Sequence, residues 1–259
     1  MINLKNDEEI ELLRESNMLV SLTLAEVARH IKPGVPTLLL DKIAEEFIRD
    51  NEAVPGFLGY NGFPATLCIS VNEVVVHGFP SSKELADGDI VSVDCGVIKN
   101  GFYGDSAFTF EVGNVADNIK KLLKVTRECL SLGLEKVVLG NRIGDISQAV
   151  QENAEKNGYS VVREMVGHGL GRNLHEAPEV PNYGKKGQGP VLRNGMVICI
   201  EPMINLGKRQ IFQERDGWTI RTQDRLPSAH FEKAVAVKNG VAEVLSTFKF
   251  IDEVLAKKE

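Results

Sequence analysis

The dipeptide Asn100-Gly101 lies between two runs of alternating residues, and this pattern strongly limits the local fold. An Asn-Gly pair in this setting is the strongest short-range indication of a two-residue type I′ turn, because both turn residues need a positive φ. If these two residues form the turn, counting back along both strands places Gly96 opposite Asp105, with Asp94 two residues earlier. The sequence therefore predicts a β-hairpin of defined register.

The predicted hairpin brings two carboxylates together. Residues two apart on a strand share a face, so Asp94 and Asp105 lie diagonally on one side of the ribbon, about 7–8 Å apart at Cα. Two carboxylates this close repel unless a cation lies between them. Two metal ions roughly 3.5–4 Å apart would fit, with one carboxylate bridging them. The alternative is a solvated hairpin with two unrelated surface aspartates, but the small and apolar residues around them argue against it.

The second half of the chain supplies further groups of the kind that bind metals. His168 and His175 lie in a glycine-rich stretch, where a side chain can face a cavity. Glu201 ends an apolar run just before Pro202, and Glu232 lies near the start of a strand that leads to a second Asn-Gly turn. An acid in such a place is costly unless it is paired or bound to a metal. These residues extend the predicted metal site.

The charges of the candidate ligands favour two divalent cations. The four acids carry four negative charges, which two such ions cancel, and a neutral His168 completes the set. A ligand set rich in oxygen with one histidine suits Mn, Fe, Co or Zn. A neutral centre has no surplus positive charge for phosphate, and the chain has no GxxxxGK[ST] loop, which argues against a metallophosphatase. Hydrolysis of an amide beside a free amine fits better.

The expected order of elements occurs twice along the chain. A long helix, a shorter helix and several strands occupy residues 1–112, and the same order recurs in residues 113–259. Because the strands come in hairpins, we expect an α+β fold, with an antiparallel sheet backed by helices and one catalytic domain over residues 1–259. The expected elements are helices over 7–30, 117–135 and 145–156, a further helix capped by Thr37, and strands over 66–70, 73–77, 90–98 and 102–112.

The composition is that of an ordinary globular protein, with 259 residues, 43% hydrophobic content and a net charge of −6. The mild acidity argues against a broad nucleic-acid-binding face. No apolar run approaches the roughly 18 residues of a membrane span, and the acidic N-terminus does not resemble a secretory signal. The four cysteines are far apart in sequence. We therefore expect a cytoplasmic protein with reduced thiols.

Five motifs, in this order, resemble those of the type I methionine aminopeptidases, over nearly the whole chain. The motifs are residues 72–78 (NEVVVHG), Asp94 with Asp105, residues 167–169 (GHG) with 175–178 (HEAP), residues 200–202 (IEP), and residues 228–229 (SA) with Glu232. The resemblance implies the duplicated "pita-bread" fold of two pseudo-symmetric halves. It implies removal of the initiator methionine from nascent polypeptides whose second residue is small. A monomer that associates transiently with the ribosome is the expected form.

The resemblance also implies roles for individual residues. Glu201 would act as general base as well as metal ligand, His175 would stabilise the oxyanion, and His77 would contact the substrate amide. The implied metal ligands are Asp94, Asp105, His168, Glu201 and Glu232, with Asp105 and Glu232 bridging. The implied methionine pocket consists of Phe57, Tyr60, Phe63, Cys68 and Trp218, whose aromatic walls suit a thioether.

The sequence departs from the family pattern at several positions around the site. Gly96 replaces a common Thr that helps to hold the substrate amine, and Phe57 replaces a small residue. Leu174 replaces a common Phe, which suggests a reshaped pocket. His230 and Lys233 replace a usual Gln and His on either side of Glu232, and His230 lies on the same strand face as that acid.

Three other interpretations remain open at this stage. Xaa-Pro aminopeptidases and prolidases share similar motifs but carry an extra N-terminal domain, for which this chain has no room. Type II methionine aminopeptidases insert a helical subdomain, whereas here His168 and Glu201 are only 33 positions apart. A non-catalytic binding protein with the same fold would tend to lose metal ligands, and all five are present.

Overall fold

The computed structural model describes residues 1–258 and begins with two helices that follow the predicted boundaries closely. Helix α1 (Asp7–His30) starts with a capping box: the Asn6 side chain accepts a hydrogen bond from the Glu9 amide, and the Glu9 carboxylate accepts one from the Asn6 amide. Helix α2 spans Thr37–Asp50.

The predicted capping role of Thr37 is wrong. Pro36 is the N-cap of α2, and Thr37 is its first helical residue. The Thr37 hydroxyl donates to the carbonyl of Ser81 at 3.1 Å and accepts from the Ser81 amide at 2.8 Å. The side chain therefore fastens a distant loop to the start of α2, and this long-range partner replaces the local capping bond.

The predicted hairpin is confirmed in its register. Strands β4 (Ile90–Lys99) and β5 (Phe102–Glu111) pair antiparallel, with Gly96 opposite Asp105 and Asp94 two residues earlier on β4. Both turn residues have positive φ, 52° and 77°, as a type I′ turn requires. Local turn chemistry is sufficient to set which side chains share a face.

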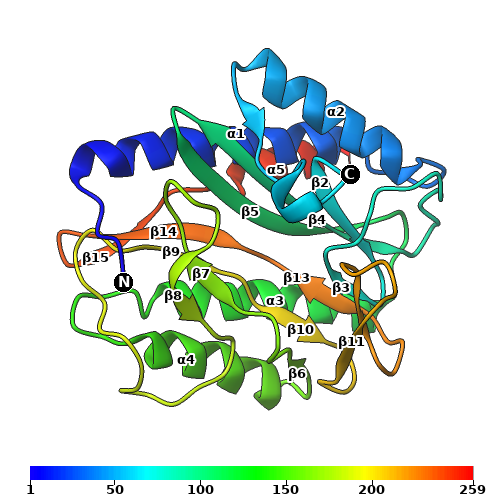
Figure 1. Cartoon of the computed structure of the whole chain (residues 1–259). Helices are drawn as coiled ribbons and strands as arrows, with labels where there is room; N and C mark the ends of the chain where they lie inside the picture. Colours follow the sequence, from blue (N-terminus) through cyan, green and yellow to red (C-terminus); the bar gives the residue numbers. More distant parts are fainter. Residues whose placement is uncertain (259) are drawn as a thin grey trace.

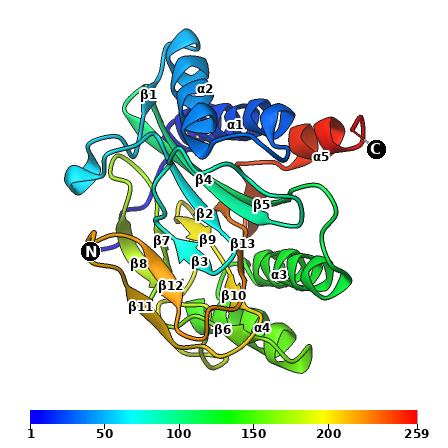
Figure 2. The same cartoon turned by 90° about the vertical axis from the view of Figure 1, so that its right-hand side faces the viewer.

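All the strand pairs among the described residues are antiparallel, which confirms the α+β class. Figures 1 and 2 show the strands in a central layer, with α1, α2 and α5 on one side of the molecule and α3 and α4 on another. The remaining helices are α3 (Asp117–Leu134), α4 (Ile143–Lys156) and α5 (Lys249–Leu255). The other strands are β1 (Val54–Pro55), β2 (Leu67–Val71), β3 (Val74–Val76), β6 (Ser160–Val161), β7 (Gly167–Gly169), β8 (Glu176–Val180), β9 (Val197–Ile200), β10 (Met203–Asn205), β11 (Ile211–Gln213), β12 (Ile220–Thr222), β13 (Ser228–His230), β14 (Lys233–Lys238) and β15 (Val241–Val244).

Strand β5 joins the N-terminal elements to the C-terminal ones. The Glu232 amide donates to the carbonyl of Ala107 at 2.9 Å, and the Ser106 hydroxyl donates to the carbonyl of Glu232 at 2.7 Å. The Thr109 hydroxyl donates to the carbonyl of His230, also at 2.7 Å. These bonds hold the segment that carries Glu232 directly beside the strand that carries Asp105.

The core is built from the helices and the central strands. Leu13, Leu24, Leu40 and Ile48 on the first two helices are fully buried, as are most apolar residues of β4. All four cysteines are buried and free. Within residues 1–258, no helix is both long enough and apolar enough to cross a bilayer.

Helix α1 packs so closely on β5 that only glycine fits at position 104. A Cβ added to Gly104 would lie 2.5 Å from the backbone carbon of Ser16 and 2.7 Å from the Asn17 nitrogen. The neighbouring Asp105 amide donates to the Asn17 side chain at 3.1 Å. This close contact therefore fixes the distance between the backbone at Asp105 and helix α1.

We expect Gly104→Ala to lower the free energy of unfolding by about 2 kcal/mol, because backbone atoms cannot move aside as a side chain can. Chemical denaturation of the metal-free protein measures this loss. Leu22→Ala, at a 38% exposed position on the same helix, is the control and should change stability by less than about 0.5 kcal/mol. Equal stability of Gly104→Ala and the wild type would contradict the close contact.

Candidate metal centre and active site

The hairpin brings two of the predicted ligands into a water-poor space. Asp105 is 3% exposed, and neither its Oδ1 nor the Oδ1 of Asp94 has a hydrogen-bond partner. An unpartnered buried carboxylate oxygen is costly, so such atoms indicate a missing positive partner. The two aspartates thus behave as open ligand positions.

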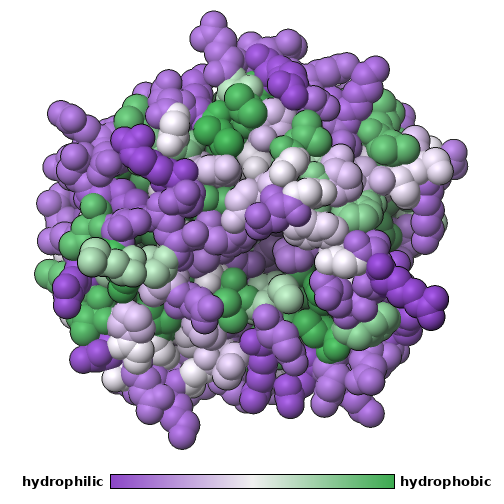
Figure 3. Space-filling model, viewed as in Figure 1, coloured by the Kyte–Doolittle hydropathy of each residue, from purple (hydrophilic) through white to green (hydrophobic). Residues whose placement is uncertain are grey.

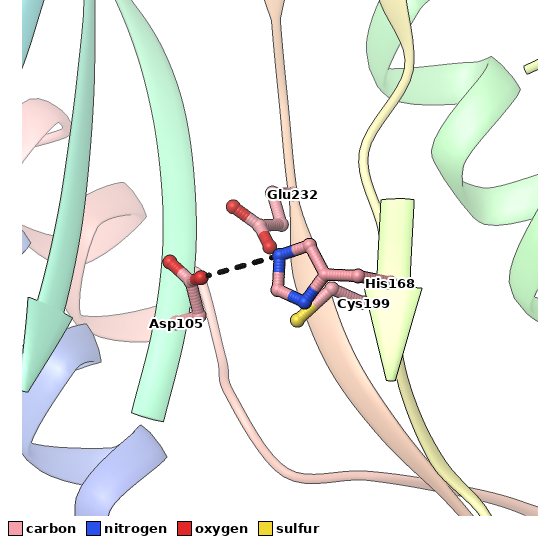
Figure 4. Close-up of side chains that lie close together, drawn as sticks. All are labelled: Asp105, His168, Cys199 and Glu232. Atoms are coloured by element: carbon pink, nitrogen blue, oxygen red, sulfur yellow. Dashed lines mark ion pairs between the residues drawn. The ribbon is translucent and has the colours of Figure 1, made fainter. Parts of the chain in front are cut away.

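The C-terminal half places three more groups against them. On β7, the Nε2 of His168 lies 3.6 Å from the Oδ2 of Asp105 and 3.6 Å from the Oε1 of Glu201. Glu232 is 2% exposed, and its Oε1 has no hydrogen-bond partner. Figure 4 shows the side chains of Glu232 and His168 pointing toward Asp105, His168 from β7 and Glu232 from the short link between β13 and β14. The structure therefore brings the predicted ligands together in one cluster.

The acids in this cluster cannot all be ionised without a counter-charge. Burial, followed by repulsion from Glu232 and Asp94, raises the pKa of Asp105 well above its usual range. Burial and repulsion from Asp94 raise the pKa of Glu201, and burial with repulsion from Glu201 and Asp94 raises that of Glu232. Burial raises the pKa of Asp94 to about 6. A divalent cation would stabilise the ionised forms and supply the missing positive charge.

His168 is prepared to bind a metal through Nε2. Its Nδ1 lies 3.0 Å from the carbonyl of Gly169, and donation to this carbonyl leaves the Nε2 lone pair free toward the acids. Burial lowers the pKa of His168 to about 4, so the ring is neutral at physiological pH. The donor set therefore fits a divalent metal ion.

Cys199 also belongs to this cluster, although the sequence reasoning did not include it. Its Sγ and one ligand atom each of Asp105, His168 and Glu232 all lie within 4.8 Å of one another (Figure 4). Burial, followed by the nearby charges of Glu232 and Asp105, raises the pKa of the thiol well above its usual value. A usable signal was present, because Cys199 and Glu201 are two residues apart and share a side.

His230 and Lys233 lie on opposite sides of the Glu232 segment. His230 is 1% exposed, and its Nε2 lies 3.6 Å from the Oε2 of Glu201 with no hydrogen-bond partner. Lys233 points away from the metal cluster, with its Nζ 4.3 Å from the centre of the Phe248 ring. Of these two departures from the family pattern, only His230 reaches the site.

Two further histidines, His175 and His77, lie beside the cluster and line the same cavity. The ring of His175 is 4.4 Å from that of His168, and its Nδ1 is 2.8 Å from the Tyr60 hydroxyl. His77 follows β3 with a φ of +59°, and its ring lies 6.1 Å from that of Trp218. Burial lowers the pKa values of both histidines, that of His77 to about 4.

A strap at the N-terminus supports the loop that carries His175. The Nζ of Lys5 lies 2.6 Å from the Oε2 of Glu176, and both side chains are only 5% exposed. The Lys5 amide also donates to the carbonyl of Gly195 at 2.7 Å. Removing one partner of such a pair leaves the other charge buried and unpaired, which is costly. The pair therefore holds residues 3–5 against Glu176, the residue that follows His175.

One cavity of about 160 Å³ joins the metal cluster to the predicted methionine pocket. The five predicted pocket residues line it, and the Phe63 ring meets Trp218 edge-on at 5.1 Å. Leu174 lines it as well. The residues that line this cavity are Phe57, Tyr60, Asn61, Phe63, Cys68, His77, Asp94, Asp105, His168, Leu174, His175, Glu201, Trp218 and Glu232. In Figure 3 the apolar residues of the visible face form small separate patches in a mostly hydrophilic surface.

Comparison with known proteins shows the family of the chain. The sequence profile of metallopeptidase family M24 matches residues 11–239. The methionine aminopeptidase of Clostridium perfringens is 51% identical over 249 residues, which is 96% of this chain and 100% of that protein. Methionine aminopeptidase 1 of Bacillus subtilis is 48% identical, over 95% of this chain and 99% of that protein.

Solved structures separate the close relatives from the distant ones. The methionine aminopeptidase of Rickettsia prowazekii superposes with a TM-score of 0.94 at 40% identity, over 95% of this chain and all of that one. A prolidase from Pyrococcus furiosus shares only the fold, with a TM-score of 0.76 at 22% identity, and this chain covers 65% of its length. Only β8 and β9 lie between His168 and Glu201, in keeping with the type I pattern. The chain is therefore a member of metallopeptidase family M24 and belongs, within it, to the type I methionine aminopeptidases.

Proposed function

We propose that this enzyme removes the initiator methionine from nascent polypeptides with a small second residue, using five protein ligands around two divalent ions. The observation that carries the proposal is the set of buried, unpartnered carboxylate oxygens of Asp94, Asp105 and Glu232 at the end of an aromatic pocket. Four acids and two divalent ions give a neutral centre. The bound ions would supply a Lewis acid and lower the pKa of an attacking water.

Three side chains around the metal site have positions that suit the other steps of the hydrolysis. Glu201 lies beside His168 with a raised pKa, which suits a carboxylate that takes the proton of the attacking water. The Tyr60 hydroxyl lies 2.8 Å from the Nδ1 of His175, and donation from this hydroxyl would leave the ring proton on Nε2 to stabilise the oxyanion. His77 lines the same cavity near Trp218, where it can contact the substrate amide.

The pocket geometry supports methionine as the residue removed. Phe63, Trp218 and Tyr60 form aromatic walls of the 160 Å³ cavity, and a thioether gains about 0.3–1.5 kcal/mol from such contacts. Manganese, iron, cobalt and zinc all suit the ligand set. We also propose that residues 1–259 act as one catalytic domain built of the halves 1–112 and 113–259, as a cytoplasmic monomer that meets its substrate through transient ribosome contact.

A peptide assay tests the function directly. We expect cleavage of Met-Gly-Ser with added Mn²⁺ or Co²⁺, no cleavage of an Xaa-Pro dipeptide, and loss of activity with a chelator. Preference for the Xaa-Pro substrate would instead indicate a prolidase. No cleavage of either peptide with any of the four metals would indicate a binding protein.

Replacing His175 should separate catalysis from metal binding. We expect His175→Ala to lower kcat about 10²- to 10³-fold, because one oxyanion donor is lost, with unchanged metal content. Steady-state kinetics and metal analysis of the same sample measure both quantities. The matched control is His30→Ala, since His30 lies at the exposed end of α1. A fall in metal content would show that His175 is a ligand instead.

The raised carboxyl pKa values predict how pH affects the metal-free enzyme. These carboxyls keep their protons in the fold at pH values where the unfolded chain is ionised, so stability falls as pH rises through the folded pKa, about 6 for Asp94. The lowered pKa values of His77 and His168 act the opposite way, but only below about pH 6.5.

We therefore expect the unfolding free energy of the metal-free enzyme to fall between pH 6.5 and 8, by up to about 1.4 kcal/mol per pH unit for each carboxyl still protonated. Saturating Mn²⁺ should remove this fall. Glu232→Gln, which deletes one of the acids, should make it shallower. Urea denaturation in chelator and in Mn²⁺ provides the measurement, and identical pH profiles in the two solutions would contradict the expectation.

A further inference from the structure

The ring of Phe57 lies directly on the backbone of Gly96. A Cβ added to Gly96 would be 2.4 Å from Cε1 and 2.7 Å from Cδ1 of that ring. Carbon atoms do not approach so closely without a shift, so the ring occupies the space that a side chain at position 96 would need. A side chain larger than that of glycine at position 96 and an aromatic ring at position 57 therefore exclude one another.

A second glycine, Gly56, positions the Phe57 ring over Gly96. Strand β1 pairs with β4, and the next residue, Gly56, donates from its amide to the carbonyl of Gly96 at 2.7 Å. A Cβ on Gly56 would meet the carbonyl carbon of Gly96 at 2.9 Å. Because the two backbones touch at this crossing, the residue that follows, Phe57, is placed over Gly96.

This contact lies beside the metal ligands. Gly96 pairs with Asp105 and follows Asp94 by two residues on the same side of β4. Phe57 is 6% exposed and lines the cavity that also contains Trp218. The ring therefore forms part of the pocket wall beside the strand that carries Asp94.

We propose that Phe57 and Gly96 form one steric unit that sets the width of the methionine pocket next to the metal centre. The proposal depends on the proposed function only for the identity of the side chain that fills the pocket. Position 96 contributes no polar side chain to bind the substrate amine. The Phe57 ring instead determines which substrate side chain this wall of the pocket accepts. The departures from the family pattern at positions 57 and 96 are then a single, mutually compensating change.

A double-mutant cycle on the metal-free protein tests the unit without any substrate. We expect Gly96→Ala to lower the Tm by roughly 5 °C, because its Cβ displaces the ring. Phe57→Leu should lower it by a similar amount, and the double variant should lose clearly less than the two losses added together. Phe63→Leu is the matched control. Phe63 lines the same cavity, but none of its atoms is among the three nearest to a Cβ built at Gly96. Its effect should add to that of Gly96→Ala.

Kinetics on Met-Ala-Ser and Phe-Ala-Ser test the consequence for the pocket. Gly96→Ala should raise KM for the methionine peptide about tenfold with kcat within about twofold, and adding Phe57→Leu should recover most of that loss. Phe57→Leu alone should lower the preference for methionine over phenylalanine about tenfold. Additive Tm losses, or an unchanged KM in Gly96→Ala, would overturn the steric unit. Failure of the wild type to cleave Met-Ala-Ser would instead refute the proposed function, and the Tm cycle would still decide the coupling.

Discussion

Repulsion among four closely placed carboxylates, two of them almost fully buried, is the constraint that the rest of the site must satisfy. Glu201 and Glu232 belong to the C-terminal half, and Asp94 and Asp105 belong to the hairpin, yet all four share one space that water scarcely reaches. No lysine or arginine is among the residues that line this cavity. Positive charge has to come from outside the chain, so folding of the loaded enzyme and its chemistry depend on the same ions.

The backbone keeps these repelling groups together by contacts that carry no net charge. The amide of Glu232 donates to the carbonyl of Ala107, and Ser106 donates back to the carbonyl of Glu232. These bonds align the second half of the chain with the edge of the hairpin one residue away from Asp105. The Gly104 contact with α1 holds the same strand from the other side. The site is therefore positioned by main-chain geometry, and its side chains are free to face the metal.

The sequence predicts some of these features because their causes are local. The hairpin register follows from Asn100-Gly101, and the alternation along β4 and β5 then gives the relation of Asp94 to Asp105. The convergence of the second-half ligands on that pair was foreseen from ordered motifs, since no local rule brings β7 beside β5. The position of Cys199 beside Glu232 and the fit of the Phe57 ring on Gly96 depend on packing between distant segments. The Thr37 cap was predicted wrongly for the same reason, because its partner Ser81 lies 44 residues away.

The N-terminal strap links the order of the His175 loop to a segment far away in the sequence. Lys5 pairs with Glu176, the residue after His175, and Ile2, partly buried, packs against the main core a few residues earlier. Removal of Lys5 would leave the carboxylate of Glu176 buried and unpaired, which is costly. Proteolytic trimming of these few residues would therefore loosen the His175 loop while leaving every predicted metal ligand in place.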